Sequence, residues 1–244
     1  MAIFHFSLKS GRKGSAANHA NYIARKGKYS SDESSDLKAT AHGNLPDWAE
    51  NDPVTFWRKA DSYERANGAA YREYVVALPN ELTLEQHRQV VQEFIEKEIG
   101  NKPYHYAIHD PQASIGGGQQ PHAHVMYSDR LPDEFVRAPE LHFKRYNSHD
   151  PELGGCKKDS GGKDRGSVRE KLIEQRETWA TILNTALEQS GHSDRVDHRS
   201  HRDRGLVHAP EKHIGQYGVK KMSETEKSQL KQSRQRRADS PSPQ

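Results

Sequence analysis

Two histidines stand one residue apart in QQPHAHVMYSDR, residues 119–130. If this stretch is a strand, His122 and His124 point to the same face with their β-carbons about 7 Å apart, because strand side chains alternate with a period of two. If YHYAIH (residues 104–109) is the preceding strand and pairs antiparallel with it, His109 comes alongside. Three neutral imidazoles with open positions can hold a catalytic ion of the zinc or manganese type, which acts as a Lewis acid. The spacing therefore favours a metal site, although a single histidine usually makes only an ordinary polar contact.

Tyr22 is the second residue whose surroundings suggest chemistry, because it lies among Asn18, His19, Arg25 and Lys26. A tyrosine hydroxyl can form a covalent intermediate, and nearby cations stabilise its phenolate form. Attack on a phosphorus atom that a metal ion polarises is therefore chemically coherent. Taken alone, the residues favour the ordinary alternative, a tyrosine whose ring packs inward while its hydroxyl stays in water.

The elements that must position these residues follow from periodicity and capping signals. Strands are predicted in IFHFSL (3–8), AYREYVVALP (70–79), YHYAIH and PHAHVMYS (121–128). Helices are predicted in SAANHANYIARK (15–26) with Ser15 as N-cap, from Asp52 to Gly68, after the capping box TLEQ (83–86), and from the capping box SVRE (167–170) to Gly191. SSDESSDLKATAHGNLP (30–46) is predicted to be a loop. We expect an α/β domain whose central antiparallel sheet carries the histidines, with helices packed mainly on the opposite face.

Composition limits the class of protein. A single cysteine, Cys156, excludes an internal disulfide framework and a cysteine-rich zinc module, which favours a reducing compartment. No apolar run has the length of a membrane span, and MAIFHFSLKS lacks the apolar core of a secretory signal, so we expect a cytoplasmic protein without membrane insertion. Residues 1–30 contain six Lys or Arg and no acid, which fits a polyanion partner as well as a solvated terminus.

Two domain regions are predicted. Residues 1–209 form the folded domain, and residues 210–244 form a basic tail or linker that the near absence of apolar residues predicts to be disordered. That tail holds eight Lys or Arg and four Asp or Glu, a net charge of +4, which exceeds the +3 of the whole chain.

Several motifs together resemble the MobA/MobL family of plasmid mobilisation relaxases. They occur in the family's order: MAIFHFSLKSGRKGSAANHANYIARKGKY (1–29), YERANG (63–68), ALPNELTLEQ (77–86), YAIHDP with PHAHVMYSDR, HFKRYN (142–147) and VDHRS (196–200). The resemblance covers residues 1 to about 215. The combination is far more specific than any one motif.

The resemblance implies a metal-dependent, strand-specific DNA nicking enzyme with an HUH-type relaxase palm. Such a relaxase nicks at a plasmid's transfer origin by tyrosine transesterification, keeps the 5′ phosphate on the tyrosine and later religates the strand. The family's nucleophile maps onto Tyr22 and its metal triad onto His109, His122 and His124, with His105 as an alternative first ligand. Mn²⁺ or Mg²⁺ is the expected ion, with Zn²⁺ as an alternative. Glu73 resembles a family acid that takes the tyrosine's proton or orients a metal-bound water.

The resemblance also implies a DNA surface and partners. Phosphate contacts and aromatic stacking suit single-stranded DNA at the transfer origin. The candidates are Arg12, Lys13, Arg25, Lys26, Lys28, Tyr29, Arg199 and Arg202. Lys144, Arg145 and Tyr146 either serve similarly or face solvent. Accessory mobilisation proteins and a type IV secretion coupling protein are the expected protein partners.

Two alternatives stay open at this point. A rolling-circle replication initiator or a transposase uses the same tyrosine and histidine chemistry, and transfer of a nicked strand in a mobilisation assay separates them. A non-catalytic single-stranded DNA-binding module would use the histidines for a closed structural metal site and the tyrosines only for stacking. It predicts DNA binding without a covalent adduct.

Overall fold

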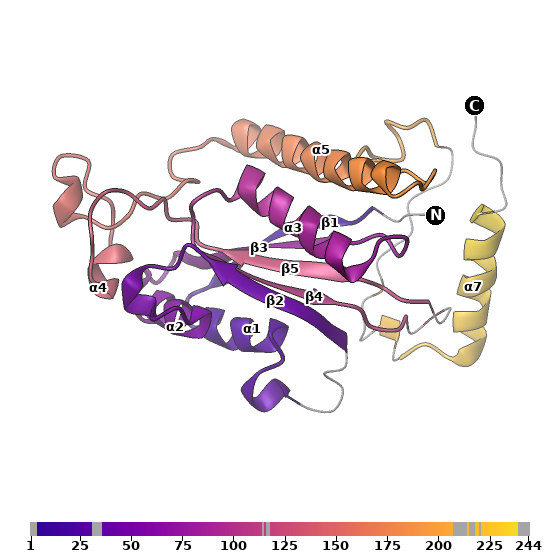
Figure 1. Ribbon diagram of the computed structural model, residues 1–244, viewed down its shortest axis with the longest axis horizontal. Coiled ribbons are helices and arrows are strands. Elements are labelled where there is room, and N and C mark those ends of the chain that lie inside the picture. The colour runs from indigo at the N-terminus through magenta and orange to yellow at the C-terminus, as the bar shows by residue number, and fades with distance from the viewer. Residues whose placement is uncertain are drawn as a thin grey trace.

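Figure 1 shows the computed structural model of the chain. It describes residues 4–30, 36–113, 115, 118–206, 214, 218–219 and 221–238. The two histidine-bearing stretches lie in the middle of a sheet, and helices lie on either side of it.

The sheet has five antiparallel strands. They are β1 (Phe6–Arg12), β2 (Leu37–Gly43), β3 (Ala69–Ala77), β4 (Tyr104–His109) and β5 (His122–Tyr127), in the spatial order β1-β3-β5-β4-β2. The loop prediction for residues 30–46 is wrong where β2 pairs with β4. β2 is an edge strand of partly buried or exposed residues, so burial imposes little alternation on its sequence, and its pairing depends on β4.

Helices cover both faces of this sheet. The long helices α3 (Leu84–Glu98) and α5 (Arg165–Gln189) lie on one face, as predicted, and the shorter α1 (Ala16–Ile23) and α2 (Pro53–Tyr63) lie on the other (Figure 1). Strand alternation divides the core accordingly, because Tyr74, Val76 and Val125 pack with α3 and α5, whereas Ala107 and Met126 pack with α1 and α2. The predicted α/β architecture with a central antiparallel sheet is confirmed, with α1 and α2 added on the histidine face.

Of the four predicted helix starts, those at Asp52 and Thr83 hold, that at Ser15 holds in position without a side-chain cap, and that at Ser167 is wrong. The Asp52 carboxylate accepts from the backbone N–H groups of Val54 (3.1 Å) and Thr55 (2.9 Å), and Thr83 forms the reciprocal capping box with Gln86. SVRE does not open a helix, because α5 begins earlier, at Arg165, capped by the Asp164 carboxylate. The Asp164 cap lies three residues before the serine that starts the SVRE pattern.

The remaining elements are short, apart from one helix near the C-terminus. Helix α4 spans Pro139–His142, and single 3₁₀ turns span Gly27–Tyr29, Asp47–Ala49 and Pro151–Leu153. Helix α7 (Glu224–Ala238) lies inside the segment for which composition predicts disorder, and a reciprocal Ser223–Glu226 cap begins it. Good helix formers and the capping box favour this helix although it has no apolar face, and the disorder of the tail stays a prediction. The rest of the predicted tail lies mostly outside the described residues.

Helix α1 takes its N-terminal cap from α2 rather than from Ser15. The Asp61 carboxylate accepts from the backbone N–H groups of Gly14 (2.7 Å), Ala16 (2.9 Å) and Ala17 (2.9 Å), whereas the Ser15 hydroxyl donates to the Arg12 carbonyl. A carboxylate at this end also interacts favourably with the helix dipole. Asp61 therefore fixes the helix that carries Tyr22 against α2.

We expect Asp61→Ala to lower the free energy of unfolding by about 1–2 kcal/mol, because it leaves N–H groups at the start of α1 without their acceptor. Urea unfolding followed by circular dichroism measures the change. The matched control is Asp47→Ala, an exposed aspartate for which we expect less than about 0.5 kcal/mol. Equal losses in the two variants would show that Asp61 is not a structural cap.

Candidate active site

The three predicted histidines converge where β4 ends and β5 begins. The register places His109 directly opposite His122, and His124 opposite Ala107 on the same face. The ring centroids are 5.6 Å apart for His109 and His122, 5.5 Å for His109 and His124, and 5.2 Å for His122 and His124. The structure therefore brings together the imidazoles that the strand spacing grouped.

The connection between these strands preserves that register. Gln112 and Gln119 form an isolated antiparallel bridge, and the Gln120 N–H donates to the Pro111 carbonyl at 3.0 Å, so the hairpin continues beyond the strands. His105, the alternative ligand, lies further back on β4, opposite Met126, and its Nε2 lies 3.2 Å from the Thr40 hydroxyl. The structure groups His109 with the pair on β5.

His122 and His124 each have one ring nitrogen held by an acceptor. Nδ1 of His124 lies 2.8 Å from Glu73 Oε1, and Nδ1 of His122 lies 2.9 Å from the Gln120 carbonyl. Because a carbonyl and a carboxylate only accept, each Nδ1 carries the proton and each Nε2 has a free lone pair. This is how a neighbouring shell prepares an imidazole to bind a metal.

His109 is held differently. Its Nε2 lies 2.8 Å from the Ile23 carbonyl and its Nδ1 lies 3.3 Å from Asp36 Oδ2, so Nε2 donates to the carbonyl in this arrangement. Burial, together with the nearby Arg25 guanidinium, lowers the pKa of His109 to about 4. Burial also lowers the pKa of His122. Neutral imidazoles are the form that binds a metal, and His109 can join the ligand set by exchanging its bond to Ile23.

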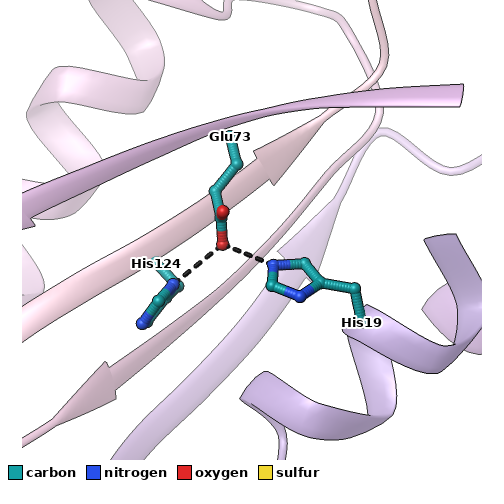
Figure 2. Close-up of side chains that lie close together, drawn as sticks. All are labelled: His19, Glu73 and His124. Carbon is teal, nitrogen blue, oxygen red and sulfur yellow. Dashed lines mark hydrogen bonds and ion pairs between the residues drawn. The ribbon is translucent and has the colours of Figure 1, made fainter. Parts of the chain in front are cut away.

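Glu73 links His124 to a residue that the sequence analysis did not assign, His19. Figure 2 shows the Glu73 carboxylate between the two imidazoles, with Oε1 2.7 Å from His19 Nε2 and 2.8 Å from His124 Nδ1. One ligand atom from each of these three residues lies within 4.8 Å of the others, as in a metal site. Ligands around one ion at about 2.0–2.2 Å lie roughly 3 Å apart, so the shorter separations here are those of hydrogen bonds. We therefore interpret Glu73 as the residue that orients both imidazoles.

The protonation state of Glu73 follows from these contacts. The side chain is 3% exposed, and this burial opposes ionisation, but hydrogen bonds from His124 and His19 outweigh it and lower the pKa of Glu73 to about 2. Glu73 is therefore a carboxylate at neutral pH and a weak base. A signal for His19 was present in the sequence, because His19 and Tyr22 are three residues apart on one helix.

Tyr22 lies on the open side of α1 beside this network. Its side chain is 39% exposed, and its ring is 5.9 Å from that of His19, 5.4 Å from that of Tyr29, and 4.9 Å below the Arg25 guanidinium carbon. It belongs to neither of the two core clusters found among the described residues. An inward-packed structural tyrosine is therefore not what the fold contains at this position.

Residues 14–225 match the sequence profile of the MobA/MobL family. The chain belongs to that family. The predicted family resemblance is thereby confirmed over most of the chain.

Two relatives extend this match. Over 207 residues this MobA/MobL chain is 46% identical to the 43 kDa relaxation protein of Salmonella typhimurium, with 84% of this chain and 56% of that protein covered. It is 40% identical to mobilization protein A of Escherichia coli, with 88% of this chain and 30% of that protein covered. The chain thus spans little more than half of the first relative and less than a third of the second.

The fold of this MobA/MobL chain has a solved counterpart. A structure from work on the molecular basis of vancomycin resistance transfer in Staphylococcus aureus matches 82% of this chain and all of its own, with a TM-score of 0.59 and 23% identity. At that identity the likeness concerns the fold alone. None of the helices in the described part of the chain has both the length and the apolar character needed to cross a membrane.

The predicted DNA contacts of this MobA/MobL chain fall into two groups. Near Tyr22 and Tyr29, Lys28 lies over the Tyr29 ring and Lys26 is exposed between the two tyrosines in the chain, whereas Arg12 and Lys13 are exposed before the start of α1. Arg25 forms an ion pair with Asp36 at 2.7 Å, so its side chain is held within the site and is not available to contact a phosphate. Arg199 and Arg202 follow α5 on a segment whose Val196 packs in the core of the opposite sheet face, and no contact among the described residues joins them to Tyr22. Their role in DNA binding stays a prediction.

Proposed function

We propose that this chain nicks one DNA strand at a plasmid's transfer origin by transesterification onto Tyr22. The observation that carries the proposal is an exposed tyrosine on α1 beside a cluster of three neutral or acceptor-held imidazoles, in a member of a mobilisation family. Single-stranded plasmid DNA is then the substrate. Accessory mobilisation proteins and a type IV secretion coupling protein are the partners we propose for transfer.

The reaction exchanges one phosphodiester bond for another. The Tyr22 oxygen bonds to the scissile phosphorus, the bond from phosphorus to the 3′ oxygen breaks, and that oxygen leaves as a 3′ hydroxyl after taking a proton. The 5′ end stays on Tyr22 as a phosphotyrosine. Because the energy of the broken bond is retained in the new one, attack by a 3′ hydroxyl reseals the strand.

The neighbouring residues orient the groups and move the proton. Glu73 accepts from Nε2 of His19, which leaves Nδ1 as the basic nitrogen on a ring adjacent to that of Tyr22. His19 then accepts the phenol proton, and Glu73 is the positioning residue. Arg25, held by Asp36, places its positive charge over the Tyr22 ring.

His122 and His124, with His109 as the third ligand, are the residues that we propose to hold a divalent ion. When bound, Mn²⁺ or Mg²⁺, with Zn²⁺ as an alternative, supplies Lewis-acid stabilisation of charge on the scissile phosphate. The hydrogen bonds at Nδ1 of His122 and His124, which leave Nε2 of each ring free, and the lowered pKa values of His109 and His122 fit such an ion.

The test is a covalent adduct assay. We expect a labelled single-stranded oligonucleotide that carries the plasmid's transfer origin to form a protein–DNA band on a denaturing gel with Mn²⁺ or Mg²⁺, and to lose at least about 90% of it with a chelator. An oligonucleotide of scrambled sequence is the control. DNA binding without any adduct would overturn the proposal and favour a non-catalytic binding module.

A further inference from the structure

A strongly basic pocket lies away from the histidines, near α4. It has a volume of about 470 Å³, within the range of small-ligand sites. Six of its eleven lining residues are cationic and none is acidic, and the lining is Arg65, Arg130, Lys144, Arg145, Tyr146, Cys156, Lys157, Lys158, Ser160, Gly161 and Gly162. A concave surface of one charge sign concentrates counter-charged ligands, so this pocket suits an anion.

The back wall of this pocket is held in place by buried ion pairs and hydrogen bonds. Arg130 is 3% exposed, forms a bidentate ion pair with the buried Glu64, and donates to the carbonyls of Lys144 (2.8 Å) and Cys156 (2.7 Å), and also to that of Phe143. Lys158 contacts the same Glu64 at 3.2 Å. Two cations thus share one carboxylate, which leaves a net positive charge behind the pocket. Because the N–H groups of Arg130 already donate to Glu64 and to backbone carbonyls, Arg130 stabilises the back wall of the pocket and does not bind the ligand.

The front of the pocket carries groups that are not used in this way. Lys144, Arg145 and Lys157 are exposed, and within the described part of the chain no side-chain bond of theirs is present. The Tyr146 ring makes no ring contact with another described residue and lines the same pocket. Unpaired cations beside a free aromatic ring are the combination that binds single-stranded nucleic acid, the cations at phosphates and the ring beneath a base.

The separation between His124 of the histidine cluster and Arg130 of the pocket suits a continuous DNA strand. Arg130 follows His124 by six residues, and an extended chain of that length spans at most about 20 Å. At ~3.4 Å per stacked step, about six nucleotides cover that distance. A DNA strand bound at the histidine cluster therefore needs about six further nucleotides to reach the level of Arg130 at the back wall of the pocket.

We propose that this pocket is a second binding site for single-stranded DNA, in which Lys144, Arg145 and Lys157 contact phosphates and Tyr146 stacks on a base. The proposal deepens the proposed function, on which it rests for the choice of DNA as the anion. The site anchors the strand several nucleotides from the scissile phosphate and sets the length of DNA that the chain holds.

Fluorescence anisotropy with a labelled oligothymidylate of about 24 nucleotides tests this in a chelator, where no adduct chemistry takes place. We expect the triple variant Lys144→Ala, Arg145→Ala, Lys157→Ala to bind at least about tenfold more weakly than the wild type. The slope of log K against log salt should fall by about 2, because three phosphate contacts are lost at roughly 0.7 each. The matched control removes three cations from α3 and α5, Arg88→Ala, Lys97→Ala and Lys171→Ala, and should change affinity less than about threefold.

Variants of Tyr146 distinguish the contribution of base stacking from that of the cations. We expect Tyr146→Ala to weaken binding about fivefold or more and Tyr146→Phe to bind like the wild type, because stacking needs the ring and not the hydroxyl. The proposal is overturned if the basic triple variant loses no more affinity than the control triple, or if Tyr146→Phe binds as poorly as Tyr146→Ala. These binding results do not depend on nicking. If the triple variant binds DNA more weakly but the wild type forms no covalent adduct, the proposed function is overturned and the DNA-binding pocket is supported.

Discussion

Tyr22→Phe should abolish the covalent protein–DNA adduct, with a fall of at least about a thousandfold, while the affinity for the same oligonucleotide stays within about threefold. The substitution removes only the hydroxyl oxygen, which is the atom proposed to bond to phosphorus. The ring contacts with His19 and Tyr29 and the Arg25 guanidinium over the ring need no hydroxyl. At 39% exposure the side chain contributes little to the core, so the variant should unfold at the temperature of the wild type.

Tyr29→Phe is the matched control for this experiment. Tyr29 lies 5.4 Å from Tyr22 between ring centroids, carries the same hydroxyl and follows the same helix. We expect its adduct yield to stay within about fivefold of the wild type. An adduct that persists in Tyr22→Phe and disappears in Tyr29→Phe would move the nucleophile to Tyr29, and one that persists in both would exclude tyrosine transesterification.

The histidine cluster could be predicted from the sequence because its geometry is local. His122 and His124 share a face by strand alternation, and His109 joins them through a hairpin whose two strands are neighbours in the chain. The helix start at Asp52 and the Thr83–Gln86 box are equally short-range signals. Such features need only a few residues of context.

The missed features depend on contacts between distant parts of the chain. Asp36 reaches His109 across 73 positions, and Asp61 caps α1 from 45 positions away at Ala16. β2 was predicted to be a loop because its ladder partner, β4, lies far along the chain. Glu73 could be placed near the tyrosine only through the family resemblance, and its bond to His19, 54 positions away, has no periodic signature in either segment. Long-range pairing of polar side chains leaves no pattern that propensity or periodicity can detect.

The buried ion pair of Glu64 and Arg130 should dominate the stability of the region around the basic pocket. The two side chains are 2% and 3% exposed, and Glu64 also contacts Lys158. Glu64→Gln keeps the shape but leaves two largely buried cations without their carboxylate, and breaking a buried pair from one side typically costs about 3–5 kcal/mol. We expect the free energy of unfolding to fall by that amount in urea titrations.

Glu93→Gln is the control, because Glu93 forms an exposed i,i+4 pair with Lys97 and should cost less than about 0.5 kcal/mol. If Glu64→Gln is too unstable to purify, Arg130→Lys keeps the charge but loses the bidentate geometry, and it should be destabilised to a smaller extent. A loss below about 1 kcal/mol in Glu64→Gln would show that the pair does not stabilise this region.

The same pair predicts a dependence on pH. Burial alone would raise the pKa of Glu64, but the charges of Arg130 and Lys158 and the hydrogen bonds to the carboxylate outweigh it and hold the pKa below its ordinary value. A carboxylate with a lowered folded-state pKa contributes its full stability above the unfolded pKa of about 4.3 and loses it as the pH falls through the folded value. The stability gap between wild type and Glu64→Gln should therefore be constant near neutral pH and shrink below about pH 4, because protonation of Glu64 then breaks the same ion pair that the substitution removes.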